Sequence, residues 1–263
     1  MDKAYAYDNY LAKVYEHSPF LSTDMGSVIQ FYVNTVVEQG GPVLEFGTAT
    51  GLFTIPIARA GVEIDTIDIS DQMIAAFHKN LEHEETAVKD KITLHQMDFG
   101  EVKLNKKFRC VIFPDNALIA VQSLEQQLKL LKIAFDHLES GGILVFDVFT
   151  PDLNLLNQKK DYSFCEFTIP EEPDHYYLGH RYTSVKPLRQ LLNIDFIHEK
   201  YTATGEFVEK KHSSIYFRYM FPSELRLALT LIGFRIRKYM EDFVTLDKKV
   251  QYETPQICIA FKP

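Results

Sequence analysis

The fold is decided by residues 42–69, P-V-L-E-F-G-T-A-T-G-L-F-T-I-P-I-A-R-A-G-V-E-I-D-T-I-D-I. Two short apolar runs in it, Val43 to Phe46 and Val62 to Ile67, have the length and residue types of buried strands. The residues between them pass through a glycine turn and then show a spacing compatible with a helix. The second run ends in an acid, Asp68. The stretch therefore predicts, in order, a strand, a glycine turn, a helix and a second strand that ends in a carboxylate.

The glycine turn has the properties of a nucleotide site. Gly47 and Gly51 allow positive φ angles and a close approach of a ligand to the backbone, and the helix that follows directs free N–H groups toward that ligand. The two hydroxyls of a ribose are donors, which one carboxylate at the end of the next strand can accept as a pair. We expect Asp68 to be that carboxylate.

The spacing of the glycines favours one kind of nucleotide. A dinucleotide-binding turn has the pattern G-x-G-x-x-G, which brings a pyrophosphate against the end of the helix. This chain has only G-x-x-x-G. It also has Glu45 two residues before the first glycine, where a carboxylate would repel a pyrophosphate but attract an ammonium or sulfonium group. The turn thus favours S-adenosylmethionine over NAD as the cofactor.

A resemblance to motifs I and II of the class I S-adenosylmethionine-dependent methyltransferases is carried by V-L-E-F-G-T-A-T-G and I-D-T-I-D-I-S, and it extends over residues 41–147. It implies that Glu45 lies near the methionine part of the cofactor and that Asp68 binds the ribose. It also implies that the loop under the cofactor consists of Gly47, Thr48, Ala49 and Gly51. The family commonly has glycine where this chain has Ala49, and a left-handed backbone there costs on the order of 1–2 kcal/mol.

The resemblance implies an adenine site after the next strand. Ile69, at the end of the second strand, is placed to touch the adenine. A third predicted strand, Ile92 to Gln96, ends in M-D-F. In the resembled family an acid at this position holds the adenine amino group. The resemblance therefore implies that Asp98 has this role here, with Phe99 as its neighbour. Asp98 is also consistent with a loop aspartate that caps a turn.

The chemistry is expected after a fourth predicted strand, Phe108 to Phe113. This strand is followed by P-D-N-A-L, where the resembled family opens its methyl-transfer site. The resemblance therefore implies that Asp115 lies beside the cofactor and that Asn116 lies at the reaction. Asn116 is also a suitable N-cap for the short segment Ala117 to Val121.

The N-terminal segment, residues 1–20, carries tyrosines at spacings that place several on one side of a helix. One interpretation is an aromatic stripe packed on the body of the protein. The other comes from the resemblance, because the segment Y-D-N-Y-L-A-K-V-Y is similar to an N-terminal segment that closes over cofactor and substrate. In that case Tyr7 contacts the cofactor and Tyr15 lies at the reaction.

Helical and apolar strand patterns alternate along the first 150 residues, which predicts a parallel, doubly wound sheet with its site at the carboxyl ends of the strands. The expected helices cover residues 23–38, 52–60, 70–83, 124–138 and 222–231, and the fifth strand covers 143–148. Residues 233–240 and 256–263 predict two final strands, which form an antiparallel hairpin at the sheet edge in the resembled family. The predicted fold is thus α/β, with a Rossmann-like seven-stranded sheet.

The residue pattern changes in residues 152–221, where β-branched and aromatic residues alternate and T-A-T-G-E is typical of a turn. This predicts an inserted antiparallel sheet of three or more strands. Its aromatic residues either line a substrate pocket or build the core of the insert. The predicted division of the chain is an N-terminal lid (1–20), a Rossmann-like core (21–151 and 222–263) and a substrate cap (152–221).

Composition excludes several classes of partner. The chain has 263 residues, 46% of them apolar and 24% charged, with a net charge of −8, so nucleic acid binding is not expected. No apolar run is long enough to span a bilayer, and no secretory signal is visible. The three cysteines lack metal or disulfide spacing and no metal cluster is visible. We expect a cytoplasmic protein, either a monomer or a homodimer, without membrane or metal.

A catalytic base is required only if the acceptor keeps its proton at the reaction pH. Histidine is the usual candidate near neutral pH, and the histidines at positions 17, 175, 180 and 212 lie outside the predicted Rossmann-like core. His180 is the preferred candidate, next to Arg181, which can bind a substrate carboxylate bidentately.

The expected function is transfer of a methyl group from S-adenosylmethionine to N or O of a small metabolite, such as a sugar amine or another natural-product intermediate, by in-line displacement. In methyltransferases of similar layout, a lid and an inserted sheet give small-molecule specificity. The alternatives are an RNA or protein methyltransferase, which the acidic charge disfavours, and a non-catalytic protein that binds S-adenosylmethionine.

Overall fold

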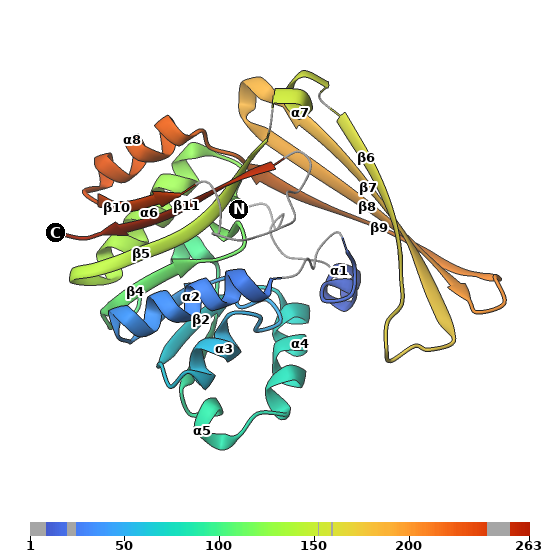
Figure 1. Ribbon diagram of the computed structural model, residues 1–263, viewed down its shortest axis with the longest axis horizontal. Helices are drawn as coiled ribbons and strands as arrows, with labels where there is room; N and C mark the ends of the chain where they lie inside the picture. Colours follow the sequence, from blue (N-terminus) through green and yellow to red (C-terminus); the bar gives the residue numbers. More distant parts are fainter. Residues whose placement is uncertain (1–8, 20–24, 152, 159, 241–252) are drawn as a thin grey trace.

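The computed structural model describes residues 9–19, 25–151, 153–158, 160–240 and 253–263. Within them the chain forms a seven-stranded sheet with helices on both faces and a separate four-stranded antiparallel sheet (Figure 1). The predicted α/β fold class with an antiparallel insert is therefore confirmed. The prediction for Tyr7 and the start of the helix predicted over residues 23–38 lie outside the described residues.

The seven-stranded sheet has the order β10-β11-β5-β4-β1-β2-β3. The parallel strands are β1 (Val43–Phe46), β2 (Ile64–Asp68), β3 (Ile92–Gln96), β4 (Phe108–Phe113) and β5 (Leu138–Pro151). β11 (Glu253–Phe261) runs antiparallel to β5, and β10 (Arg235–Met240) antiparallel to β11, which confirms the predicted terminal hairpin. The carboxyl ends of β1, β2 and β4 therefore meet along one edge of the sheet.

Two helical layers cover the seven-stranded sheet. On one face, α2 (Gly26–Gln39) and α3 (Thr54–Arg59) pack on apolar side chains of β1, β4 and β5. On the other face lie α6 (Leu124–His137) and α8 (Pro222–Ile232). The remaining helices are α4 (Asp71–Glu82) and α5 (Thr86–Lys89), together with the 3-10 turns η1 (Phe99–Glu101) and η2 (Ala117–Ile119). Cys110 and Cys258 are buried in this core, as expected for small apolar residues.

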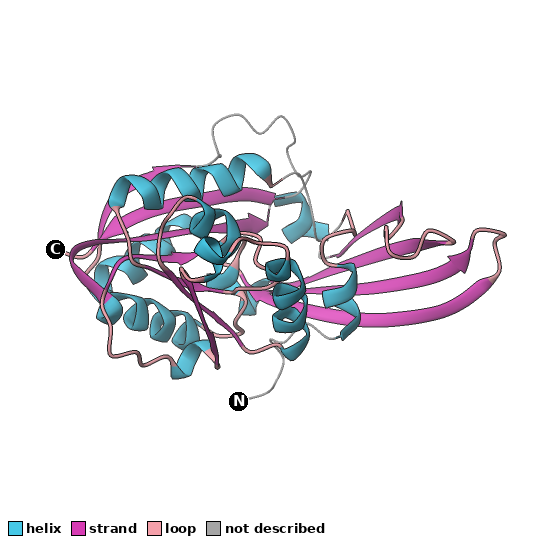
Figure 2. Ribbon diagram, turned by 90° about the horizontal axis from the view of Figure 1, so that it is seen from below, coloured by secondary structure: helices cyan, strands magenta, loops and turns pink. Residues whose placement is uncertain are grey.

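The four-stranded sheet consists of β6 (Lys160–Phe167), β7 (His175–Lys186), β8 (Leu191–Thr202) and β9 (Phe207–Arg218), each antiparallel to the next. A short helix, α7 (Leu153–Gln158), precedes it, and the turn η3 (Pro187–Arg189) joins β7 to β8. The sheet extends to one side of the helix-covered core (Figures 1 and 2). One of its faces carries buried apolar residues that continue the main core, and the other is largely exposed.

The N-terminal helix α1 (Asn9–Val14) lies in the gap between the core and the four-stranded sheet (Figure 1). Leu11 and Val14 on it are almost fully buried. Because α1 contacts α4 on one side and β9 on the other, it connects the two parts of the molecule.

One predicted boundary was wrong. The helix that starts at Leu124 ends at His137, and β5 begins at Leu138 instead of Ile143. The reason is that the glycine pair 141–142 belongs to an extended segment bonded to the C-terminus: the N–H of Gly141 donates to the carbonyl of Lys262, and the N–H of Lys262 to the carbonyl of Gly142.

Candidate active site

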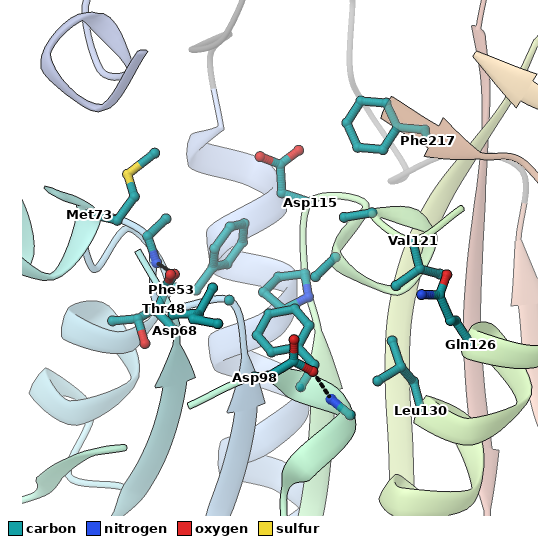
Figure 3. A pocket seen from close by; sticks show the side chains of 18 of the residues that line it. Thr48, Phe53, Asp68, Met73, Asp98, Asp115, Val121, Gln126, Leu130 and Phe217 are labelled. Atoms are coloured by element: carbon teal, nitrogen blue, oxygen red, sulfur yellow. Dashed lines mark hydrogen bonds between the residues drawn. The ribbon is translucent and has the colours of Figure 1, made fainter. Parts of the chain in front are cut away.

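A pocket opens at the carboxyl ends of β1, β2 and β4, where an open α/β sheet binds its ligand, and it has about 1100 Å³ of free space including the solvent at its mouth. Its walls come from these strand ends, α1, α6 and β9. Figure 3 shows Asp68 and Met73 on one side of the pocket, and Val121 and Phe217 on the other. The pocket therefore joins the helix-covered core to the four-stranded sheet.

The glycine turn forms one wall of the pocket. Gly47 has φ +99°, and a Cβ on it would lie 3.5 Å from Ala117 Cβ and 3.8 Å from the Phe99 ring, inside the pocket. Ala49 is left-handed with φ +45°, the conformation whose cost was expected. Its N–H donates to Asp68 Oδ2 at 2.8 Å, so the carboxylate of Asp68 holds the strained residue in place.

Asp68 is the central acid of this wall. Its Oδ1 accepts from the N–H of Ser70 at 2.9 Å and its Oδ2 from Ala49, and a carboxylate has about four lone-pair sites in all, so some are left for a ligand. Burial raises the pKa of Asp68, and the N–H bonds from Ser70, Ala49 and Ile69 partly oppose this. The carboxylate thus sits at the pocket surface with capacity for further donors, such as hydroxyls.

Two residues of the predicted cofactor loop lie behind the pocket. Glu45 is fully buried; its Oε2 accepts from Thr66 at 2.7 Å and from Thr54, while its Oε1 has no hydrogen-bond partner. Burial raises the pKa of Glu45 to about 7. Gly51 does not line the pocket: a Cβ there would lie 2.7 Å from the Phe77 ring, so this glycine permits α4 to pack closely.

The end of β3 closes another part of the pocket. Asp98, Phe99 and Ile69 all line it, and Ile69 is 42% exposed. Asp98 caps the turn η1, since its Oδ1 accepts from the N–H of Gly100 at 2.7 Å (Figure 3). Both interpretations of Asp98 are therefore compatible, because its second oxygen is not used by this cap.

A further part of the pocket wall carries a tyrosine and a second acid. The hydroxyl of Tyr15 donates to Asp115 Oδ2 at 3.0 Å, and both residues line the pocket. Burial raises the pKa of Asp115, although the hydrogen bonds from Tyr15 and Asn116 act in the other direction. A carboxylate with a raised pKa beside an open pocket can hold or accept a proton there.

Asn116 lies next to the pocket but does not line it. The suggestion that its side chain caps the following turn was wrong, because Asn116 itself is left-handed with φ 67° and makes no capping bond. Its Oδ1 instead accepts from the N–H of Phe149 at 2.8 Å, and its Nδ2 reaches Asp115 Oδ1 at 3.4 Å. Asn116 thus ties the loop after β4 to the end of β5.

His180 is not brought to this pocket. It lies in β7 on the exposed face of the four-stranded sheet, where its Nδ1 is 3.0 Å from the hydroxyl of Tyr162 and its ring packs against Phe164. Because neighbours in a strand point to opposite faces, Arg181 lies on the other face. It does not line the pocket either, and its Nε is 3.4 Å from Thr183 Oγ1.

Several lining residues had no recognisable signal in the sequence. They come from the start of α3 and α4, from the segment after β4, from α6 and from the end of β9: Leu52, Phe53, Met73, Gly100, Pro114, Ala117, Ala120, Val121, Gln126, Lys129, Leu130 and Phe217. Gln126 and Leu130 are four residues apart, so they lie on one side of α6. Their place in the first turns of a helix that follows a strand end was the one clue that the sequence offered.

The lining fits an adenosine-like ligand. It places the carboxylates of Asp68 and Asp98 where hydroxyl and amino donors can be accepted, and the apolar side chains of Ile69, Phe99 and Leu130 where a flat base can pack. The absence of a Cβ on Gly47 leaves room for a ligand against the turn. The hydrogen-bond acceptors, the apolar side chains and the free space at Gly47 are thus those that an adenosine-like ligand requires.

Comparison with known proteins agrees with this geometry. A family described as methyltransferase domain matches residues 20–236. The glycine/sarcosine N-methyltransferase of Aphanothece halophytica is 27% identical over 152 residues, which span 56% of this chain and 56% of that protein. This chain thus covers little more than half the length of that relative.

Two solved structures share the fold over almost the whole chain. The CcbJ methyltransferase from Streptomyces caelestis superimposes with a TM-score of 0.76 at 20% identity, covering 98% of both chains. CalS10, an amino pentose methyltransferase from Micromonospora echinaspora, gives a TM-score of 0.71 at 12% identity, covering 92% of this chain and 93% of that one.

The fold is Rossmann-like, and its pocket opens at the carboxyl ends of the strands. The chain belongs to the methyltransferase domain family, among the class I S-adenosylmethionine-dependent methyltransferases, and its cofactor is S-adenosylmethionine. The resemblance seen in the two sequence motifs is thereby confirmed. Among the described residues, no helix has the length and apolar character needed to cross a membrane.

Proposed function

We propose that this protein transfers the methyl group of S-adenosylmethionine to a nitrogen of a small metabolite. The observation that carries the proposal is the pair formed by Tyr15 and Asp115 on the pocket wall. A carboxylate and a phenol oxygen in contact can accept hydrogen bonds from an amine and receive its proton.

We assign the two sides of the pocket to the two reactants. The nucleoside side consists of Gly47, Ala49, Asp68, Ile69, Asp98 and Phe99; Asp68 would accept the ribose hydroxyls and Asp98 the adenine amino group. The acceptor side consists of Tyr15, Asp115, Val121 and Phe217, so two polar groups face two apolar side chains. Such a lining suits a small acceptor with one reactive polar group.

When bound, S-adenosylmethionine supplies a methyl group activated by positive sulfur: the acceptor's lone pair forms the new bond to carbon as the carbon–sulfur bond breaks and its electron pair stays on sulfur. The protein's task is to hold the nitrogen in line and to remove its proton. Asp115 is placed for both. Its raised pKa makes it a better proton acceptor than an ordinary aspartate.

The acidity of the acceptor favours nitrogen over oxygen. An ammonium group has a pKa near 10, whereas an alcohol is far less acidic, and a carboxylate is a poor base for an alcohol. Two similar proteins are named for such acceptors: one acts on glycine and sarcosine, the other on an amino pentose. These names support an amine as the acceptor. His180 has no role in this proposal because it does not line the pocket.

The division of the chain is part of the same proposal. Residues 21–151 and 222–263 would form the cofactor-binding core, residues 152–221 the substrate cap, and residues 1–20 a lid. The position of Tyr15, buried between core and four-stranded sheet with its hydroxyl on Asp115, supports a lid that completes the acceptor side.

The test is release of S-adenosylhomocysteine with matched acceptors: glycine and sarcosine against glycolate, and amino sugars, free or nucleotide-linked, against the corresponding hydroxy sugars. We expect turnover with at least one amine and none with its hydroxyl counterpart. Turnover confined to hydroxyl compounds, or binding of S-adenosylmethionine without turnover on any acceptor, would contradict the proposal.

Asp115→Asn separates the role of the acid from binding. The amide still accepts from Tyr15 but cannot take a proton, so we expect kcat to fall about 100-fold or more while the dissociation constant of S-adenosylhomocysteine stays within a factor of about 2. In the wild type, kcat/KM should fall as the pH is lowered through the pKa of Asp115, because the protonated acid accepts no proton. The Asn variant should lack this decline.

A further inference from the structure

The acid on the acceptor side sits on an unusual piece of backbone. Asp115 and Asn116 are consecutive non-glycine residues, and both have a left-handed backbone, with φ angles of 46° and 67°. In this conformation the Cβ atom crowds the following carbonyl, so two such residues in succession persist only where the surroundings hold them. The direction of the Asp115 carboxylate is set by this turn.

The surroundings that hold the turn converge on one buried side chain, Asp147 of β5. Its Oδ1 accepts from the N–H of Asp115 at 3.0 Å, and the N–H of Asn116 also hydrogen-bonds to this carboxylate. Two successive N–H groups thus surround one carboxylate, in the way that a backbone nest binds an anion. Asp147 is 7% exposed and does not line the pocket, so it has no access to a reactant.

Asp147 is itself fixed by Tyr32 of α2. The hydroxyl of this fully buried tyrosine donates to Asp147 Oδ1 at 2.5 Å. Burial and the nearby Asp115 carboxylate raise the pKa of Asp147 to about 7, although the hydrogen bonds from Tyr32, Asp115 and Asn116 act in the other direction. The charged group beside Asp147 is the Asp115 carboxylate, whereas Tyr32 is a neutral hydroxyl donor. A chain of contacts therefore runs from α2 through β5 to the acceptor side.

We propose that Asp147, clamped by Tyr32, is a positioning residue that sets the left-handed turn and thereby directs Asp115 at the acceptor. This rests on the proposed function, because it presumes that Asp115 receives the acceptor's proton. Asp147 acts only through the turn. Its loss should therefore lower the rate of methyl transfer without weakening the nucleoside side.

The variant Asp147→Asn tests this role with little change of volume. Three donors converge on the carboxylate. An amide keeps only one acceptor oxygen, and its NH2 group cannot accept from the remaining donors. We expect kcat with the best amine of the acceptor panel to fall about 10-fold or more, and the dissociation constant of S-adenosylhomocysteine to change less than about 2-fold. Tyr32→Phe, which removes only the clamp, should lower kcat by a smaller factor.

A double-mutant cycle separates positioning from general stability. In the Asp115→Asn background, adding Asp147→Asn should change kcat less than about 2-fold, since Asp147 has no other route to the reaction. The control is Asp65→Asn, the same change at a carboxylate of similar burial in β2, which contacts His95 and Lys106 and lies away from the turn. It should leave kcat unchanged. Equal losses from Asp147→Asn in both backgrounds would overturn the proposal.

A second measurement needs no acceptor. Hydrogen exchange of the Asp115 and Asn116 amides should accelerate at least about 10-fold in Asp147→Asn and remain slow in Asp65→Asn. Unchanged exchange at both amides would overturn the positioning role. If exchange accelerates while Asp115→Asn retains full activity, positioning stands and the assignment of Asp115 in the proposed function fails.

Discussion

The two sides of the pocket are built differently. The nucleoside side comes from three successive strand ends within residues 43–99, and its key groups are backbone: the open Cα of Gly47, and the N–H of Ala49 on Asp68. The acceptor side comes from α1, the turn after β4 and the end of β9, which are remote in sequence. A local turn can thus fix the cofactor, whereas the acceptor side requires the whole fold.

This difference has a consequence for substitutions. A change on the nucleoside side should act on cofactor binding even when no acceptor is present. A change on the acceptor side should leave cofactor binding intact and act on the acceptor's KM or on kcat. Two substitutions on each side test whether the sides are as separate as their construction suggests.

Gly47→Ala should give the largest effect on cofactor binding. The added methyl group would occupy pocket space against the turn, and overpacking of this kind costs about 1–3 kcal/mol, hence up to about 100-fold in the dissociation constant of S-adenosylmethionine. Calorimetry measures it directly. Gly141→Ala is the matched control: it has φ +76° and open space around its Cβ, so it carries similar backbone strain but should bind normally.

Asp68→Asn should weaken cofactor binding by about 10- to 30-fold. A hydrogen bond to a charged acceptor is worth about 1.5–3 kcal/mol, and the loss should lie at the lower end of this range because the amide still accepts one hydrogen bond. The loss should be equal with and without amine. The control is Asp65→Asn, three residues earlier in the same strand and outside the pocket. Equal weakening by both variants would mean that Asp68 acts through the stability of β2 rather than on the ribose.

The core of the fold was predictable because its signals are local. The strand β1 and its glycine turn follow from residues 43–51, and the strands β3 and β4 were predicted with the observed boundaries. The helix predicted from residue 70 begins at Asp71, with Ser70 as its N-cap. The inserted sheet followed from the alternation of β-branched and aromatic residues, and the terminal hairpin followed from the resemblance. The start of β5 was missed because a glycine pair ends a helix as readily as it permits an extended segment.

The acceptor side was predictable only in part, for a physical reason. Asp115 and Tyr15 were named through the resemblance, but the hydrogen bond between them depends on how α1 docks, which no local spacing encodes. Phe217 and Val121 reach the pocket because the four-stranded sheet lies against the core. His180 was favoured for the usual titration range of histidine, its place outside the predicted core and its neighbour Arg181, but strand alternation points these two side chains to opposite faces of the sheet.

Phe217→Ala should raise the KM of the amine about 5- to 10-fold, since the partly buried ring contributes about 1–1.5 kcal/mol of apolar contact to the acceptor side. Cofactor affinity without amine should not change. Phe207→Ala is the control: it is the same substitution in the same strand, at a ring that is 58% exposed and lies outside the pocket. A cofactor affinity lowered by Phe217→Ala would show that the two sides are not separate.

The smallest effect is expected from the ionic contact that joins α1 to the four-stranded sheet. Lys13, two residues before Tyr15, lies 2.5 Å from Glu172 Oε1, and Lys200 of β8 lies 2.7 Å from Oε2. Burial acts to raise the pKa of Glu172, but the bonds from Lys13, Lys200 and Tyr177 outweigh it and lower the pKa to about 2. The contact is therefore lost only as the pH falls from about 4.5 toward 2, and it is intact at the pH of any kinetic assay.

Glu172→Gln should raise the KM of the amine about 2- to 5-fold, because a partly exposed ion pair is worth up to about 1 kcal/mol in water and salt screens it. Salt gives the decisive comparison. Raising the ionic strength should increase the KM of the wild type toward that of the variant and leave the KM of the variant nearly unchanged. The control is Glu84→Gln, which breaks the pair with Arg59 away from α1 and should behave as wild type. If the Gln variant remains as salt-sensitive as the wild type, α1 is held by its buried Leu11 and Val14 alone, and the acceptor side depends on apolar packing instead of charge.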